Sequence, residues 1–268
     1  MTALAKPAQW WPGVARNHAL APAAAWVLWE GAGDGVSDAV DQVRGSFVNL
    51  TTDAWIGSPY GWALEFDSGA AHRIDVPFLG IARPAPFAYA MLLKPAAGAN
   101  KNQAWLSETK AAAAVPVAKF QVLSGSAAAY VGTDAGSALA ADTVAITDGG
   151  WHCCVMSSDT ATLHLYVDGD LVATDSMPAG TGLADLDTCT IGSFVFTTGG
   201  SPAYHYPAKG ELALMMMYRR HLGRADVAAL TMDPFRAFRR SAPLSVPRFL
   251  ERHYPRGFGS RAGVRGVA

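Results

Sequence analysis

Residues 148–176, DGGWHCCVMSSDTATLHLYVDGDLVATDS, combine the side chains that nucleophilic catalysis uses: a histidine, two thiols and several carboxylates. A catalytic thiol needs a base that faces it and an electropositive setting that lowers its pKa. Neighbours on a strand point to opposite faces, so His152 and Cys153 point apart. For the same reason Cys153 and Cys154 cannot easily form a disulfide with each other. We therefore interpret both cysteines as small packing residues.

The third cysteine, Cys189, does not complete a disulfide framework or a zinc site. We expect all three thiols to be reduced, which fits assembly in a cytoplasm. Calcium takes oxygen ligands, and five aspartates lie in expected loops, although none forms a D-x-D-x-D-G run. No cofactor is expected, and calcium stays open on these loop carboxylates: Asp134, Asp142, Asp148, Asp185 and Asp187.

Glu65 and Asp67 are two residues apart in GWALEFD and share one face of an expected strand. Retaining glycoside hydrolysis needs two carboxyls about 5–5.5 Å apart, one as nucleophile and one as acid. A pair on one side of the substrate cannot fill both roles. We interpret these residues as a polar strand face and a turn residue.

Aromatic side chains in loops are candidates for stacking on sugar rings, and residues 199–210, GGSPAYHYPAKG, are the best single stretch. The alternative is that these aromatics seal an edge of the fold or a subunit contact. The candidate glycan-binding residues are Trp55, Tyr60, Trp105, Tyr204, His205 and Tyr206.

Short alternating runs separated by Gly, Asp, Ser and Pro position these residues, and they predict an all-β fold. Asp168-Gly169 supplies the positive φ of a tight hairpin, and residues 117–132 form a second hairpin around Ser124 to Ser126. Residues 210–220, GELALMMMYRR, predict a strand that is apolar on both faces and is either buried on both sides or covered by the arms. One short helix is expected in GRADVAALTMDP, before Pro234.

The chain has 268 residues, half of them hydrophobic and 16% charged, which suits a folded, turn-rich protein. We expect an N-terminal arm over residues 1–23, one domain over 24–233, and a C-terminal arm over 234–268. The last segment carries eight arginines and one acid, a net charge of +7, so residues 1–233 carry −8. An acidic body with a basic tail indicates a binding partner.

Arginine and aromatic residues alternate in the C-terminal arm, which is typical of interface segments. No nucleic-acid motif accompanies the arginines, so we do not expect a nucleic-acid partner. No apolar stretch is long enough to span a membrane. An acidic protein neighbour fits better, including the next copy in a homo-oligomer. The expected partner-docking residues are Trp10, Trp11, Phe235, Arg236, Phe238, Arg239, Arg240, Arg248, Phe249, Arg252, Tyr254 and Arg256.

Five segments, in their order, resemble the concanavalin A-like, laminin G-like jelly-roll family. They span most of residues 26–238, and the most recognisable is a Trp-His-x-Val strand followed by Leu-Tyr-Val-Asp-Gly. The segments are SPYGWALEFDSGAAHRIDVP, PFAYAMLLKP, DGGWHCCVMSSDTATLHLYVDGDLV, TIGSFVF and GELALMMMYRRHLGRADVAAL. The resemblance implies two antiparallel sheets packed face to face, a two-sheet jelly-roll sandwich that hosts many functions.

Glycoside hydrolases of this family use an E-x-D-x-E or E-x-D-x-x-E run, but Gly69 and Ala70 stand where the third acid would lie. The resemblance therefore implies a protein that is not an enzyme. The helix and DPFRAFRR after it resemble virion proteins of tailed phages. We accordingly predict a non-catalytic virion protein, assembled in the host cytoplasm, that decorates a particle and docks through its arms onto capsid or tail subunits. The alternative is a lectin-like adhesin domain that recognises host surface glycans.

Overall fold

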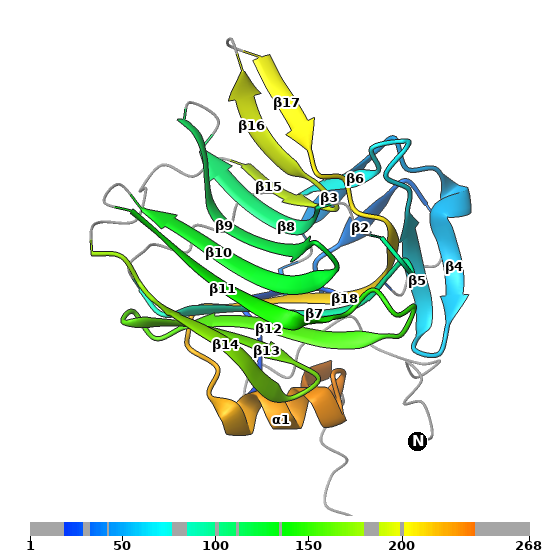
Figure 1. Ribbon diagram of the computed structural model, residues 1–268. Helices are drawn as coiled ribbons and strands as arrows, with labels where there is room; N and C mark the ends of the chain where they lie inside the picture. Colours follow the sequence, from blue (N-terminus) through cyan, green and yellow to red (C-terminus); the bar gives the residue numbers. More distant parts are fainter. Residues whose placement is uncertain are drawn as a thin grey trace, which may run out of the picture.

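The computed structural model describes residues 19–28, 33–41, 43–76, 85–99, 102–110, 113–133, 136–179, 188–198 and 201–238. Two antiparallel sheets face each other around the main core, and one helix lies outside them (Figure 1). The predicted all-β, two-sheet sandwich is confirmed. Within the described residues, no helix is long and apolar enough to cross a bilayer.

The first sheet, called sheet A, has the strand order β14-β13-β12-β7-β18-β5-β4, and β1 also pairs with β18. A short 3-10 helix, η1 (Thr52–Ala54), precedes β4. The strands are β1 (Ala24–Trp26), β4 (Trp55–Ser58), β5 (Gly61–Phe66), β7 (Phe87–Pro95), β12 (His152–Ser158), β13 (Thr162–Val167), β14 (Asp170–Ser176) and β18 (Gly210–Tyr218).

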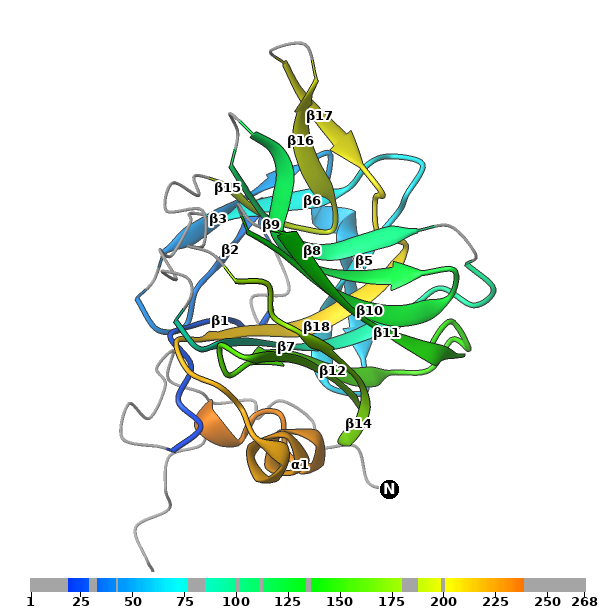
Figure 2. The ribbon, with the colours of Figure 1, turned by 60° about the vertical axis from the view of Figure 1, so that its left-hand side comes forward.

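The second sheet, called sheet B, has the order β11-β10-β9-β8-β15-β6-β3-β2. A separate hairpin, β16–β17, projects from it beside β8 and β9 (Figure 2). The strands are β2 (Gly35–Ser37), β3 (Arg44–Val48), β6 (Arg73–Val76), β8 (Gln103–Lys110), β9 (Ala113–Leu123), β10 (Ser126–Thr133), β11 (Gly136–Ala145), β15 (Thr188–Ile191), β16 (Phe194–Thr198) and β17 (Ser201–His205).

Strand β18 is buried on both faces, as the run of apolar residues predicts. Its inner face adds Met215 and Met217 to the core between the sheets. Its outer face places Met216 and Tyr218 in a second apolar cluster beneath α1 (Arg224–Met232). Helix α1 lies on the side of sheet A that faces away from sheet B (Figures 1 and 2). The helix therefore covers a sheet face that would otherwise expose apolar side chains to water.

Both predicted hairpins form through two-residue turns. Asp168 (φ +52°) and Gly169 (φ +96°) join β13 to β14, and Ser124 (φ +52°) and Gly125 (φ +93°) join β9 to β10. Positive φ at both central residues is the requirement of a type I′ turn, whose twist matches that of the paired strands.

The segment 190–196, one of the five that resemble the family, is not one continuous strand. The chain turns at Gly192, so the segment divides into the end of β15 and the start of β16. The aromatic stretch 199–210 is likewise not a loop alone, because β17 pairs with β16 through Phe194 and His205. Gly192 has φ +90°, and this turn directs the chain out of sheet B. The carbonyl of Gly192 accepts a hydrogen bond from the backbone N–H of Ala208.

Replacing Gly192 with alanine is expected to destabilise the protein. A Cβ there would overlap carbon atoms of the Phe66 ring and lie 3.0 Å from the His72 carbonyl, at a φ that favours glycine. The free energy of unfolding should fall by at least about 2 kcal/mol, the cost of overpacking plus backbone strain.

Chemical denaturation of Gly192→Ala and of Gly57→Ala measures this effect. Gly57 lies in β4, and a Cβ there meets nothing within 4 Å. The matched variant should stay within about 0.5 kcal/mol of the native chain, as surface substitutions usually do. Equal stability of the two variants would contradict the role of Gly192.

Candidate functional site

His152 is held between two carboxylates at the end of the β13–β14 hairpin. Its Nδ1 lies 2.8 Å from Oδ2 of Asp168, and its Nε2 lies 3.0 Å from Oδ1 of Asp148. The other oxygen of Asp168 accepts a hydrogen bond from the backbone N–H of Cys153 at 2.8 Å. The hydrogen bond to Asp168 is the main cause that raises the pKa of His152. This arrangement ties the hairpin turn to the start of β12.

The three cysteines are free thiols in buried positions, as predicted. Cys154 belongs to the core between the sheets, whereas Cys153 faces the cluster beneath α1. Burial raises the pKa of Cys153 to about 11 and that of Cys154 well above its ordinary value. Both thiols are therefore neutral near pH 7, and the thiolate is the form that a nucleophilic mechanism needs.

His152 is expected to make stability depend on pH. Its pKa in the folded state is raised above 6.5, so its contribution is fully present below about pH 6.5 and is lost as the pH rises through the raised value. The Tm of the native chain should fall more between about pH 6 and pH 9 than the Tm of His152→Gln.

Asp148 does not disturb this comparison. Its backbone hydrogen bond from Gly150 is the main cause that lowers its pKa, so it stays ionised across the range. Thermal melts of the two chains over the same buffers measure the difference. Parallel pH profiles would contradict a stabilising role for the two carboxylates around His152.

Glu65 lies in β5 beside a third acid that comes from a distant part of the chain, whereas Asp67 lies just after the strand. Glu65 is the register partner of Glu211 in β18, and Glu211 also pairs with Lys94, whose Nζ lies 2.7 Å from its Oε1. Asp67 instead accepts the backbone N–H of Gly69 at 3.1 Å, which is turn chemistry as predicted. These acids border a cavity of about 560 Å³ that two lysines also line. The ion pair leaves this cavity with mixed charge.

Three of the predicted glycan-binding residues are packed inward. Trp105 is fully buried between the sheets against Phe66, and Trp55 is 7% exposed. Tyr60 is half-buried, with its ring edge-on to Trp151 at a centroid distance of 5.4 Å. The prediction is therefore wrong for Trp55 and Trp105, because both side chains point into the core from strands and present no face to a ligand.

The end of β17 does present an aromatic surface. Tyr206 is 42% exposed, and its ring stacks on Phe194 with a centroid distance of 6.3 Å and an interplanar angle of 9°. His205 lies beside it, with a centroid distance of 6.2 Å. The side chain of Tyr204 lies outside the described residues. The sequence therefore located this surface through His205 and Tyr206.

A lysine lies among these rings, and together they form what we call the aromatic–lysine cluster: Lys119, Tyr130, Phe194 and Tyr206. The Nζ of Lys119 is 5.0 Å from the ring centroid of Phe194, 5.5 Å from that of Tyr130 and 5.6 Å from that of Tyr206. These distances are within the range of cation–π attraction. Lys119 is 9% exposed, and its burial lowers its pKa.

Sequence reasoning missed Lys119, Tyr130 and Phe194. Lys119 alternates with Ala118 and Phe120, which are buried in the core, so the period of two places it on the outer face of sheet B. That alternation was the available signal. It could not show that a hairpin from a distant part of the chain brings Phe194 over the lysine.

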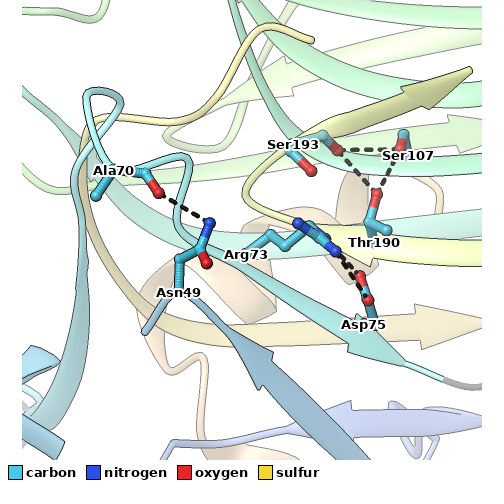
Figure 3. Close-up of polar contacts among 7 residues, drawn as sticks. All are labelled: Asn49, Ala70, Arg73, Asp75, Ser107, Thr190 and Ser193. Atoms are coloured by element: carbon cyan, nitrogen blue, oxygen red, sulfur yellow. Dashed lines mark hydrogen bonds and ion pairs between the residues drawn. The ribbon is translucent and has the colours of Figure 1, made fainter. Parts of the chain in front are cut away.

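A buried hydroxyl pair holds the base of the β16–β17 hairpin. Ser107 and Thr190 are adjacent in register, and their Oγ and Oγ1 atoms are 2.8 Å apart. Both hydroxyls donate to the carbonyl of Ser193, at 3.0 Å and 2.9 Å (Figure 3). The backbone N–H of Ala104 donates to the carbonyl of Tyr206 at 2.7 Å. These bonds attach both ends of the hairpin to β8 and so fix the two stacked rings.

The opposite side of the same face is charged. Arg73 and Asp75 both lie on β6, and Nε of Arg73 donates to Oδ1 of Asp75 at 3.0 Å (Figure 3). Asn49 lies nearby and donates to the carbonyl of Ala70 at 3.1 Å. The strand register places Asp75, Thr190, Ser107, Lys119 and Tyr130 in one row across β6, β15, β8, β9 and β10. The outer face of sheet B is therefore polar where that of sheet A is apolar.

The predicted calcium ligands are only partly described. Asp142, in β11, accepts the backbone N–H of Val144, and Asp148 accepts that of Gly150 in its own turn. Asp134, Asp185 and Asp187 lie outside the described residues. Among the described residues, no three His, Cys, Asp or Glu side chains gather as a metal site would require.

Two of the predicted docking residues are part of the body. Phe235 is fully buried and Phe238 is 4% exposed, both in the cluster beneath α1. The prediction that these rings bind a partner is wrong, because both rings are buried against sheet A. Arg236 between them is exposed, on the 3-10 helix η2 (Arg236–Phe238). The remaining predicted docking residues, including Trp10, Trp11 and every arginine from Arg239 onward, lie outside the described residues.

Comparison with known proteins agrees with this architecture. A family model of the concanavalin A-like lectin/glucanases superfamily matches residues 67–228, so the chain belongs to that superfamily. The match is to its laminin G-like branch. No curated protein matches the chain in sequence.

Solved structures share the fold at low identity. A Trypanosoma rangeli sialidase in complex with sialic acid has a TM-score of 0.58 at 12% identity, covering 81% of this chain and 33% of its own. The binding domain of Paraclostridial Mosquitocidal Protein 1 has a TM-score of 0.60 at 10% identity, covering 80% of this chain and 52% of its own. This chain thus corresponds to only a part of each, and the likeness concerns the fold.

Proposed function

We propose that this protein is a non-catalytic carbohydrate-binding module that holds its ligand on the outer face of sheet B. The observation that carries the proposal is the exposed ring of Tyr206, which is stacked on Phe194 and next to Lys119. One face of a sugar ring carries C–H groups and packs on an aromatic ring. A ring that is already held in place binds with a small loss of conformational entropy.

The absence of catalysis is part of the proposal, and the placement of the acids supports it. Glycoside hydrolysis needs two carboxyls on either side of one glycosidic bond. Asp75 lies in the same row as Lys119 but is paired with Arg73. Glu65 and Glu211 lie on sheet A, and Lys94 pairs with Glu211. Neither arrangement leaves a free acid facing the aromatic–lysine cluster.

The neighbouring folds are consistent with this function but do not carry it. One neighbour is described as a sialidase in complex with sialic acid and another as a binding domain. At these identities the likeness extends to the architecture alone. The proposal therefore rests on the residues of this chain.

Tyr206→Ala is expected to reduce carbohydrate binding. The substitution removes the stacking ring, and the loss of one buried aromatic contact of about 1.5 kcal/mol or more corresponds to a tenfold weaker Kd or worse. A glycan array, followed by calorimetry on the strongest binder, measures the change.

Trp62→Ala provides the matched control, because Trp62 is an aromatic side chain of similar exposure, 45%, on β5 of sheet A. Its removal should leave binding unchanged. Equal losses in the two variants, or no loss for Tyr206→Ala, would contradict the proposed face.

A place on a virus particle remains a second proposal for this module, with arms that bind neighbouring subunits. It is supported by the resemblance of residues 233–240 to tailed-phage virion proteins and by the exposed Arg236 at the start of the arm. Buried Phe235 and Phe238 would anchor that arm to the body. The two proposals are compatible, because docking and ligand binding would use different faces.

Deletion of residues 241–268 tests the role of the arm. The Tm should stay within a few degrees of the native value, because Phe235 and Phe238 remain in place beneath α1. Oligomers of the full chain, measured by light scattering, should dissociate. An unchanged oligomeric state would contradict docking through the arm.

A further inference from the structure

The ammonium group of Lys119 is the feature of the outer face that neutral sugar binding does not explain. The side chain is buried to nine-tenths, and its charge lies over three aromatic rings. Among the described residues, no carboxylate pairs with it. An isolated charge in such a place is costly unless an opposite charge or hydrogen bonds compensate for it.

The three rings compensate for only part of this cost. Cation–π attraction contributes about 0.5–2 kcal/mol. An ammonium also has three N–H donors, and an aromatic ring is a weaker acceptor for them than an oxygen atom. The nearest acid in the same row is Asp75, on β6. It lies three strand spacings from Lys119, which is about 14 Å. Asp75 is also bonded to Arg73, so it does not act as the counter-ion of Lys119.

We propose that Lys119 binds an anionic substituent of the ligand, a carboxylate or sulfate of an acidic sugar, while Tyr206 stacks on the sugar ring. This inference rests on the proposed function and names its substrate class. The oxygens of that substituent would accept charge-assisted hydrogen bonds from the ammonium. The lowered pKa of Lys119 agrees with a cation that has no anionic partner in the free protein.

The rigid surroundings favour this role over that of a flexible surface charge. The rings of Phe194 and Tyr206 are fixed by the bonds of Ser193 and Tyr206 to β8. The lysine is thus confined to a narrow position beside the stacking ring. An anionic group attached to the stacked sugar would lie within reach of the ammonium, and neither group would need to move far.

The experiment compares acidic sugars with uncharged counterparts on four forms of the full chain. An array carries sialylated, uronate-containing and sulfated glycans, each beside its carboxyl-reduced or desulfated form. The forms are the native chain, Lys119→Met, Lys119→Arg and Lys209→Met. Methionine keeps the length and apolar body of the side chain, and Lys209 is an exposed lysine whose loss changes the net charge equally.

The native chain should bind an acidic glycan at least tenfold more tightly than its uncharged form, the range of a hydrogen bond to a charged group. Lys119→Met should abolish that difference, while Lys119→Arg should keep part of it and Lys209→Met all of it. Comparison of the sialylated and uronate-containing glycans with the sulfated glycans distinguishes a carboxylate ligand from a sulfate. Thermal melts of each variant show that the fold is intact. If Lys119→Met does not fold, Lys119→Arg and the paired glycans still measure the preference for charge.

Two negative results have different meanings. In the first, acidic and uncharged glycans bind equally, Lys119→Met keeps this binding, and the Tyr206→Ala variant described under the proposed function loses it. This result overturns the role of Lys119 and leaves the proposed function standing. Absence of binding to every glycan on the array overturns the proposed function itself.

Discussion

The structure depends on covering both faces of β18, an interior strand of sheet A. Burial of apolar surface is the dominant favourable term in folding, and a strand that is apolar on both faces needs two partners. Sheet B covers the inner face, through the core that includes Met215 and Met217. Helix α1 and the phenylalanines Phe235 and Phe238 cover the outer face. The sandwich and the helix outside it are two consequences of one requirement.

This requirement makes the two outer faces of the molecule different. The outer face of sheet A is occupied by its own chain, so few of its side chains remain for a ligand. The outer face of sheet B carries the Arg73–Asp75 pair, a buried hydroxyl pair and the aromatic–lysine cluster. The β16–β17 hairpin adds the stacked rings to that face. The unequal covering of the sheets is the reason that the proposed ligand-binding face lies on sheet B.

The residues with the most reactive side chains serve stability instead. His152 joins two carboxylates at a hairpin, and Cys153 and Cys154 fill buried positions on the two faces of β12. Glu65 lies opposite Glu211 on the neighbouring strand, and Asp67 accepts a hydrogen bond within a turn. Chemistry inferred from residue types alone was therefore a poor guide, because burial and pairing decide whether a group can react. Exposure and orientation distinguished Tyr206 from Trp105, although both are aromatic residues in the same predicted set.

Side-chain alternation and turn residues are local properties, so the sequence alone predicted most of the strands, the two tight turns and the α-helix at Arg224–Met232. The two-sheet sandwich was expected from the resemblance of five segments to the family. The sequence also predicted that the thiols would be buried. Which outward-facing residues meet one another depends on the tertiary fold. The β-bulge between Leu212 and Leu214 changes which residues of β18 face inward, and the turn at Gly192 brings Phe194 over Lys119. Such contacts join segments far apart in the chain, and a pattern with a period of two carries no information about them.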